Sequence, residues 1–316
     1  MSKRIEYLRK QSIEAVPSIS TERAELITAF YRDFTTPVSV PVQRALVFQY
    51  LLSHKSIGIN FGELIVGEKG PAPKATPTYP ELCCHSVQDL DILHNREKIP
   101  FTVRPETREI YIHGIIPFWK GKSMRERIFN AMTPEWQAAY EAGIFTEFME
   151  QRSPGHTVLD DKIYRKGMVD FKSDIQESLD ALNFFDDPDA YHKQEELKAM
   201  AITADALVMF AHRYAALAEE KAIAVSDSQR KAELLHIGDM CKHVPAHAPR
   251  DFWEALQYYW FVHLGVTTEL NPWDSFTPGK LDQHLAPFYT QGLQDGTLTR
   301  EKAEELLQCF WIKFNN

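Results

Sequence analysis

Two polar loops carry the side chains best suited to chemistry in this sequence. One contains His156, directly after a Pro-Gly pair, and the other contains Asp274, in a polar stretch that follows an apolar segment. Proteins commonly place binding groups on loops that rigid elements hold in position. We therefore predict binding groups near His156 and Asp274, although their spacing alone names no ligand.

Histidine spacing does not indicate a metal site. His243 and His247 are four residues apart, but Pro245 lies between them and disfavours the helix that would place both rings on one face. The sequence contains no Walker loop, GxGxxG, HExxH, GxSxG, CxxC or EF-hand pattern. We therefore expect loop or surface histidines and no metal ligands.

The four cysteines are expected to be reduced thiols. Cys83 and Cys84 are adjacent, whereas Cys241 and Cys309 stand apart from other cysteines. A bridge between neighbouring cysteines would close a strained ring, and nothing in the sequence indicates an oxidising compartment. Cys83 and Cys84 are interpreted as small side chains that are buried or half-buried.

Composition indicates a globular protein that acts on a small molecule. The 316 residues are 44% hydrophobic, which is ample for a buried core, and their net charge is -9. This charge opposes binding to nucleic acid or to an anionic membrane surface. The start has no apolar signal segment, and the most apolar run, Ala255 to Val266, is too short to span a bilayer. We expect a cytoplasmic protein.

Helices must position the two loops. Apolar spacing and capping residues predict helices over residues 22–31, 41–54, 189–225, 226–240, 251–264 and 299–314. Thr133 and Pro134 predict the start of a further helix that reaches about Met149. The longest helix should bury one apolar stripe, made of Leu197, Met200, Ala204, Leu207, Ala211, Tyr214 and Ala218.

Other segments are not helical in pattern. Residues 57–66 are rich in β-branched side chains, which is typical of a strand, and residues 67–77 form a turn-rich loop. Residues 265–283 are expected to be irregular and polar. The helix over 299–314 carries many aromatic side chains, which predicts contact with a partner or with further chain.

Several segments resemble glycyl-radical enzymes, the pyruvate formate-lyase-like family, over essentially the whole chain. Segments of this kind begin at Gly62 (Gly-Glu-Leu-Ile-Val-Gly), Tyr79 (Tyr-Pro-Glu-Leu-Cys-Cys-His), Asn130 (Asn-Ala-Met-Thr-Pro-Glu-Trp), Trp260 (Trp-Phe-Val-His-Leu-Gly) and Pro278 (Pro-Gly-Lys-Leu-Asp-Gln). One segment resembles the branch of the family whose members dehydrate hydroxyproline. It ends at His156 and reads Phe-Thr-Glu-Phe-Met-Glu-Gln-Arg-Ser-Pro-Gly-His.

The resemblance implies a ten-stranded α/β barrel wrapped in helices. These residues would supply helices and the first strand or strands, so the expected fold class is mainly α with an incomplete barrel. The implied reaction is that of a lyase. A glycyl radical generates a cysteine thiyl radical, which takes hydrogen from the ring carbon beside the nitrogen of trans-4-hydroxy-L-proline. The 4-hydroxyl then leaves as water, and 1-pyrroline-5-carboxylate forms.

The sequence departs from the family pattern in the radical groups. It contains neither an Arg-Val-x-Gly-(Tyr/Phe/Trp) segment nor a Cys-Val-Glu segment, and Cys83 and Cys84 do not match the latter. We interpret residues 1–316 as a truncated amino-terminal domain that lacks the glycyl-radical domain, binds no cofactor itself and is inactive alone. The implied partners are a radical SAM iron-sulfur activating enzyme, a complementing carboxyl-terminal chain and a second copy, because the family is usually homodimeric.

By the same resemblance, Phe148, His156 and Asp274 line the substrate pocket. Asp274 would pair with the amine of the substrate, His156 would bind or protonate the leaving hydroxyl, and Phe148 would pack on the ring. Each has a structural alternative, since His156 can cap a loop, Asp274 can cap a turn and Phe148 can belong to the core.

Two other hypotheses stay open. The chain could belong to another glycyl-radical lyase or dehydratase, acting on a diol, choline or a related molecule. It could also be a non-catalytic binding module or a remnant. An incomplete barrel would leave strand edges and apolar helix faces uncovered, so we expect the isolated chain to associate or aggregate.

Overall fold

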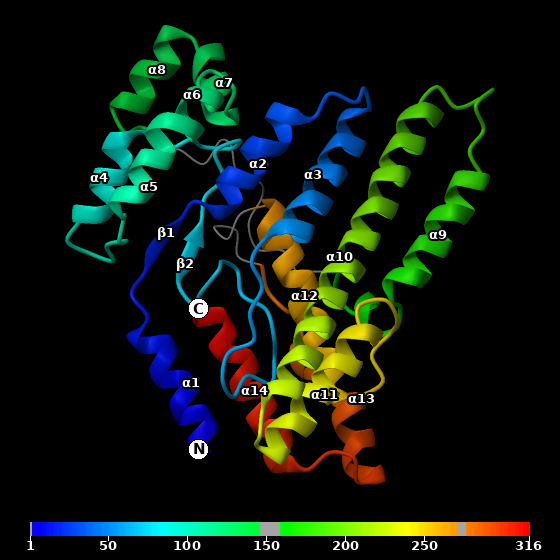
Figure 1. The fold of residues 1–316 in the computed structure, drawn as a ribbon. Helices are drawn as coiled ribbons and strands as arrows, with labels where there is room; N and C mark the ends of the chain where they lie inside the picture. Colours follow the sequence, from blue (N-terminus) through cyan, green and yellow to red (C-terminus); the bar gives the residue numbers. More distant parts are fainter. Residues whose placement is uncertain (1, 146–158, 271–275) are drawn as a thin grey trace.

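The computed structural model describes residues 2–145, 159–270 and 276–316. These residues are mainly helical, as predicted (Figure 1). In the first half the helices are α1 (Lys3–Glu14), α2 (Glu22–Asp33), α3 (Val40–His54), α4 (Val87–Asn95), α5 (Pro105–Ile110), η1 (Tyr111–Ile115), α6 (Ile116–Trp119), α7 (Met124–Ala131) and α8 (Pro134–Glu141). In the second half they are η2 (Lys162–Tyr164), α9 (Met168–Asp180), α10 (Ala190–Ala224), α11 (Ser228–His243), α12 (Phe252–Leu270), α13 (Leu281–Asp295) and α14 (Arg300–Asn315). None of the helices in these ranges is long and apolar enough to cross a membrane.

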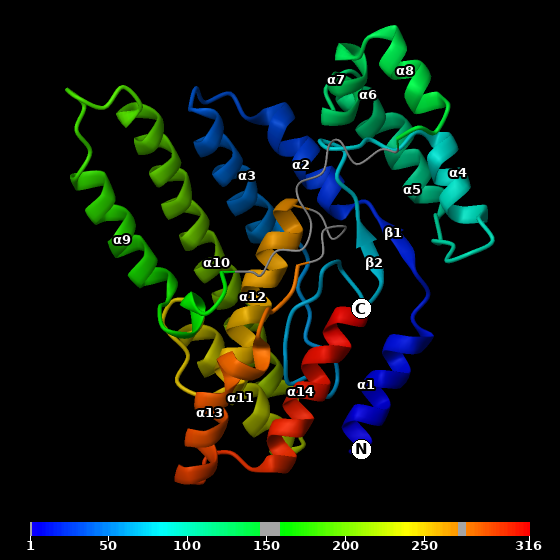
Figure 2. The same cartoon turned by 180° about the vertical axis from the view of Figure 1, so that it is seen from behind.

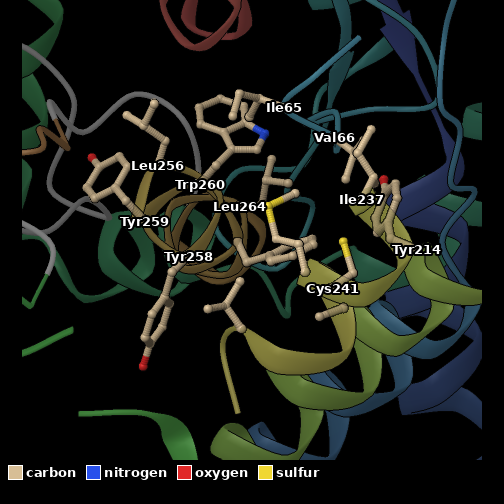
Figure 3. Close-up of a cluster of buried hydrophobic side chains, with 14 of the residues drawn as sticks. Ile65, Val66, Tyr214, Ile237, Cys241, Leu256, Tyr258, Tyr259, Trp260 and Leu264 are labelled. Atoms are coloured by element: carbon tan, nitrogen blue, oxygen red, sulfur yellow. The ribbon is translucent and has the colours of Figure 1, made fainter. Parts of the chain in front are cut away.

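Helix α12 is the centre of the main hydrophobic core. Figure 3 shows Tyr258, Tyr259 and Trp260 pointing to different sides of this helix, with Trp260 toward Ile65. Side chains on every face of α12 are 1% exposed or less, among them Ala255, Leu256, Tyr258, Tyr259, Trp260, Phe261 and Leu264. The predicted helix over residues 251–264 is therefore confirmed, and it is buried on every face.

The end of α12 differs from the prediction. The helix continues to Leu270, and α13 already begins at Leu281, so the expected irregular stretch 265–283 was wrong at both ends. Thr267 helps to explain this, because its hydroxyl donates to the His263 carbonyl within the helix, at 3.0 Å. The hydroxyl thus adds a bond to the helix and does not compete with it.

Residues 57–66 do not form the predicted strand. Leu64, Ile65 and Val66 are fully buried, but side chains of α12 take the place of a neighbouring strand. The Gln257 side chain accepts from Val66 N at 2.8 Å and donates to Val66 O at 2.9 Å. The Trp253 indole donates to Leu64 O at 2.8 Å. The N–H and C=O of Val66 and the C=O of Leu64 are therefore satisfied without a sheet.

Two short parallel strands form elsewhere, between α1 and α2 and in the turn-rich loop. They are β1 (Ser18–Ser20) and β2 (Ala75–Pro77), and Ile19 pairs with Thr76. Ser18 also makes an isolated parallel bridge to Thr102. Within the described residues β1 and β2 form the only sheet, which agrees with a chain that contributes mainly helices to a larger barrel.

Helix α10 is 35 residues long and packs against α3, α9 and α11 (Figure 1). The predicted stripe is buried from Ala204 to Ala218. Its first two members are exceptions, since Leu197 is partly exposed and Met200 is 53% exposed. Both side chains line an open groove and lie outside the core.

Helices α4 to α8 gather at one end of the molecule, away from the long helices (Figure 2). The predicted start of α8 is confirmed, because Thr133 accepts from Trp136 N at 3.4 Å and Pro134 opens the helix. Its predicted end near Met149 was wrong. The helix stops at Glu141, and Gly143 follows with a φ of 72°, a left-handed conformation that favours glycine and ends helices.

Helix α14 packs against α1 and α12, so the two ends of the chain lie in contacting helices (Figure 1). Leu306 and Phe310 are 1% and 0% exposed. These two side chains therefore pack within the chain. Leu307 and Phe314 are half-buried and Trp311 is 50% exposed, so contact of the remaining face with a partner or with further chain stays a prediction.

Candidate functional site

The three predicted site residues lie outside the described residues. Phe148 and His156 fall in the range 146–158, and Asp274 falls in the range 271–275. Their roles therefore stay predictions, and the site is built here from the described residues on either side of these ranges.

A groove opens between α3, α9, α10 and α12. Leu159 and Leu270, the described residues next to the two ranges, both line it, and its volume is about 1210 Å³. Most of its lining is apolar and includes Phe48, Met168, Phe171, Ile175, Leu207, Val262 and Val266. The fold thus brings two segments that are distant in sequence to one apolar groove, and in the sequence each of them borders a range that holds predicted site residues.

A charged pair lies where α12 meets the groove. Arg44 of α3 and Glu269 of α12 both line the groove and form an ion pair. Burial raises the pKa of Glu269 above its ordinary value, although Arg44 acts in the opposite direction. A carboxyl group with a raised pKa in a cleft is a candidate for binding or proton transfer. Sequence reasoning missed Glu269, because it placed this residue in the irregular stretch 265–283 and not in the last turn of α12.

The carboxyl end of α12 is held by two side chains from distant parts of the chain. Arg23 Nε donates to Thr268 O at 2.7 Å, and the Tyr79 hydroxyl donates to Thr267 O. The guanidinium also lies 3.9 Å from the centre of the Tyr79 ring. A positive charge at this end of a helix is favourable, because the carbonyl groups there carry partial negative charge. These contacts fix the position of the last turn of α12.

Arg23 is only 6% exposed and pairs with Glu81. Burial disfavours the charged guanidinium, but the Glu81 carboxylate outweighs this effect and raises the pKa of Arg23 above its ordinary value. The chain thus keeps a permanent buried cation next to α12. Nothing in the local sequence around Arg23 indicates this role, whereas Tyr79 and Glu81 belong to a segment that carried the family resemblance.

A second buried ion cluster joins α14 to the loop before β2. Lys313 Nζ bonds to the carboxylates of Glu63 and, at 2.7 Å, of Glu68. Burial opposes the positive charge, but the two carboxylates outweigh it and raise the pKa of Lys313 above its ordinary value. Glu63 lies in the segment at Gly62 that carried the family resemblance, and Glu68 directly follows that segment. Their contacts indicate a structural role and not a substrate-binding one.

The four cysteines lie in described parts of the chain and form no disulfide there. Cys241 and Cys309 are buried, and Cys83 and Cys84 are half-buried. Burial raises the pKa of Cys84 to about 12. None of the four lines the groove.

His243 and His247 do not share a helix face, because α11 ends at His243, as Pro245 predicted. Their rings nevertheless lie 5.2 Å apart, and His243 Nε2 bonds to Ala248 O at 3.0 Å. Among the residues with described positions, no three His, Cys, Asp or Glu side chains are grouped so that they could hold a metal ion.

Known proteins match the chain along its full length. The family model for pyruvate formate lyase-like proteins matches residues 1–316. The trans-4-hydroxy-L-proline dehydratase of Clostridioides difficile is 54% identical over 313 residues, which are 99% of this chain and 40% of that protein. Isethionate sulfite-lyase of Desulfovibrio desulfuricans is 32% identical over 309 residues, which are 94% of this chain and 37% of that protein.

A solved structure agrees with this match. The crystal structure of hydroxyproline dehydratase from Clostridioides difficile, with trans-4-hydroxy-L-proline bound, superposes with a TM-score of 0.95 and 53% identity. The match covers 100% of this chain and 40% of that one, so this chain spans about 40% of the length of its relative. Because the family model and the superposition both cover the full chain, it belongs to the pyruvate formate lyase-like family of glycyl-radical enzymes.

Proposed function

We propose that this chain forms the amino-terminal, substrate-facing part of a glycyl-radical dehydratase that acts on trans-4-hydroxy-L-proline. The observation that carries the proposal is the 54% identity with the Clostridioides dehydratase, against 32% with isethionate sulfite-lyase. A shared fold does not determine the substrate, because the side chains of the pocket do. The higher identity therefore favours hydroxyproline over the other substrates of the family.

In this proposal the chain binds and orients the substrate. Asp274 pairs with the ring amine through a charge-assisted hydrogen bond, and Phe148 packs on the apolar face of the ring. His156 is the catalytic residue, because an imidazole that titrates near neutral pH can donate a proton to the departing 4-hydroxyl. Arg23 and Tyr79 act as positioning residues, since they hold the last turn of α12.

The radical groups come from another part of the enzyme. These 316 residues contain neither family segment for the glycyl radical and the thiyl cysteine, and none of their cysteines lines the groove. We therefore assign residues 1–316 to the amino-terminal pyruvate formate lyase-like domain. The radical would be installed by a radical SAM activating enzyme on a carboxyl-terminal polypeptide, and the assembled enzyme would be a homodimer.

The test is calorimetric titration of trans-4-hydroxy-L-proline, with the cis isomer and proline as competitors. It uses the chain alone and a chimera in which the unmatched carboxyl-terminal part of the Clostridioides dehydratase follows it. We expect stereoselective, saturable binding to the chimera. Asp274→Asn should weaken it about tenfold or more, because a charge-assisted hydrogen bond contributes about 1.5–3 kcal/mol. Asp33→Asn, at the exposed end of α2, is the matched control.

Other outcomes would contradict the proposal. Preferential binding of isethionate or a diol by the chimera would assign the chain to another lyase of the family. A folded chimera that binds none of these molecules would favour a non-catalytic module.

A further inference from the structure

The groove between α3, α9, α10 and α12 is too large for the proposed substrate alone. Its volume is about 1210 Å³, whereas pockets for drug-sized ligands are roughly 300–1,000 Å³. Hydroxyproline and isethionate, the molecules named for two relatives, are smaller than such ligands. Either molecule would therefore fill only part of the groove.

The groove exposes apolar side chains and offers few free charges. Val40 and Met200 line it and are 70% and 53% exposed. The charged groups of its lining are largely paired, as in the ion pairs Arg44–Glu269, Lys166–Asp174 and Arg165–Asp161. Its occupant should therefore be apolar, and an exposed apolar surface of this kind marks a contact with protein.

The relatives show how much protein is available to cover it. This chain superposes on 40% of the Clostridioides dehydratase with a TM-score of 0.95, so more than half of that polypeptide lies outside the matched part. The outside part has to pack on the matched part. Leu159 and Leu270 line the groove, and in the sequence each of them borders a range that holds predicted substrate residues.

We propose that this groove is the docking surface for an apolar segment of the polypeptide that follows the matched part in these relatives. The inference deepens the proposed function and rests on it, because it names the surface at which the substrate-facing half meets the half with the radical groups. Contacts with α9 and α10 would cover Leu197 and Met200, the two members of the α10 stripe that the chain itself leaves uncovered.

The test measures the reactivity of an engineered thiol in the groove. Met200→Cys places the thiol in the groove, and Ile223→Cys places one on the same helix outside it, at a position that is 83% exposed. Maleimide labelling of each variant is compared between the chain alone and the chimera described above. Peptide mass spectrometry separates the new thiol from the four native cysteines.

The proposal expects labelling of Met200→Cys to slow by about tenfold or more in the chimera, and labelling of Ile223→Cys to stay the same. Equal labelling of Met200→Cys in both proteins overturns it. Protection in the chain alone that disappears on dilution also overturns it, in favour of a second copy as the occupant. Protection in the chain alone that is independent of protein concentration would indicate a small apolar ligand in the groove, and this result would also overturn the proposal.

A second measurement covers the case in which the chimera does not fold. The chain and the carboxyl-terminal polypeptide are co-expressed with separate tags, and Met200→Arg is compared with Ile223→Arg. Co-purification that Met200→Arg reduces at least about tenfold supports the proposal, whereas unchanged or absent co-purification contradicts it. Titration with hydroxyproline on the same samples separates the two proposals. If the thiol at position 200 is protected but hydroxyproline does not bind, only the assignment of the substrate is wrong and the docking surface stands.

Discussion

At the scale of single residues, two buried side chains around α12 depend on long-range contacts. Arg23 joins α2 to the end of α12 through Thr268 O and also pairs with Glu81. His263 lies inside the aromatic cluster of α12 and α14, where its ring stacks on Trp260 at 5.0 Å. Neither residue has a local signal in the sequence, because both are defined by what surrounds them in space.

Removing the Arg23 guanidinium should be strongly destabilising. In Arg23→Leu, the Glu81 carboxylate loses its buried partner and Thr268 O loses its donor. We expect the free energy of unfolding to fall by about 3–5 kcal/mol, the usual cost of breaking one side of a buried pair. Urea unfolding measures it, with Arg32→Leu as the control on the same helix, because Arg32 forms an exposed pair with Asp33. Equal stability of the two variants would contradict the assigned role.

His263 should make stability depend on pH. Burial, with a smaller effect of Lys69, lowers the pKa of His263 from 6.5 to about 3. As the pH falls, the unfolded chain therefore binds a proton at His263 before the folded chain does. The stability that the neutral His263 ring contributes is complete above about pH 6.5 and is lost toward about pH 3. When the pH is lowered from about 7.5 to about 5, the free energy of unfolding of the wild type should fall by about 2 kcal/mol more than that of His263→Gln.

Urea unfolding at the two pH values checks this prediction. His113→Gln is the control, because the His113 side chain is 73% exposed. Between the two pH values, this variant should lose as much free energy of unfolding as the wild type. An equal loss in His263→Gln would show that His263 titrates normally in the folded protein.

At the scale of elements, α14 tests whether these residues form their own core. Its aromatic face predicted contact with a partner or with further chain, and the structure places α1 and α12 against part of this face. Phe310 contacts Tyr259 and Trp260 with ring centres 5.7 and 6.2 Å apart. The helix therefore belongs to the core of this chain.

Truncating Phe310 should lower the free energy of unfolding much more than truncating the neighbouring Trp311. Phe310→Ala leaves a cavity at a fully buried position, so we expect a loss of about 3–5 kcal/mol in the free energy of unfolding. Trp311→Ala, at a position that is 50% exposed, should cost clearly less. Both values come from chemical denaturation. A small effect of Phe310→Ala would mean that α14 is not packed in the isolated chain.

At the scale of the whole molecule, two hydrophobic clusters divide the chain unequally. The larger surrounds α12, α10 and α11, and the smaller lies among α2, α3 and the short helices near η1. Helices α7 and α8 contribute no buried residue to either. Local stability follows buried contacts, so the molecule should not open uniformly.

Hydrogen exchange of the intact chain should show which helices open more readily than others. We expect the amides of α7 and α8 to exchange at least about tenfold faster than those of α12, because opening them exposes little apolar surface. Peptide-resolved mass spectrometry measures both sets in one sample, with α10 as a second buried reference. Equal protection of α8 and α12 would mean that the chain opens as one cooperative unit.

The sequence by itself determined the features that depend on local pattern. Thr133 and Pro134 predicted where α8 begins, and apolar spacing predicted α3, α10, α11, α12 and α14, because caps and helical periodicity act within a few residues. The segments that resemble glycyl-radical enzymes also identified the family, which the full-length match confirmed. The roles of Phe148, His156 and Asp274 came from that resemblance and stay predictions.

Only the tertiary structure decided the features that depend on distant residues. Residues 57–66 carry the composition of a strand, yet Gln257 and Trp253 of α12 satisfy their backbone from elsewhere in the chain. Arg23 reaches Thr268, and α1 covers α14 from the opposite end of the sequence. The groove likewise exists only where α9, α10 and α12 meet. Such contacts leave no periodic trace in sequence, because burial and hydrogen bonding are decided by whatever the folded chain brings next to each residue.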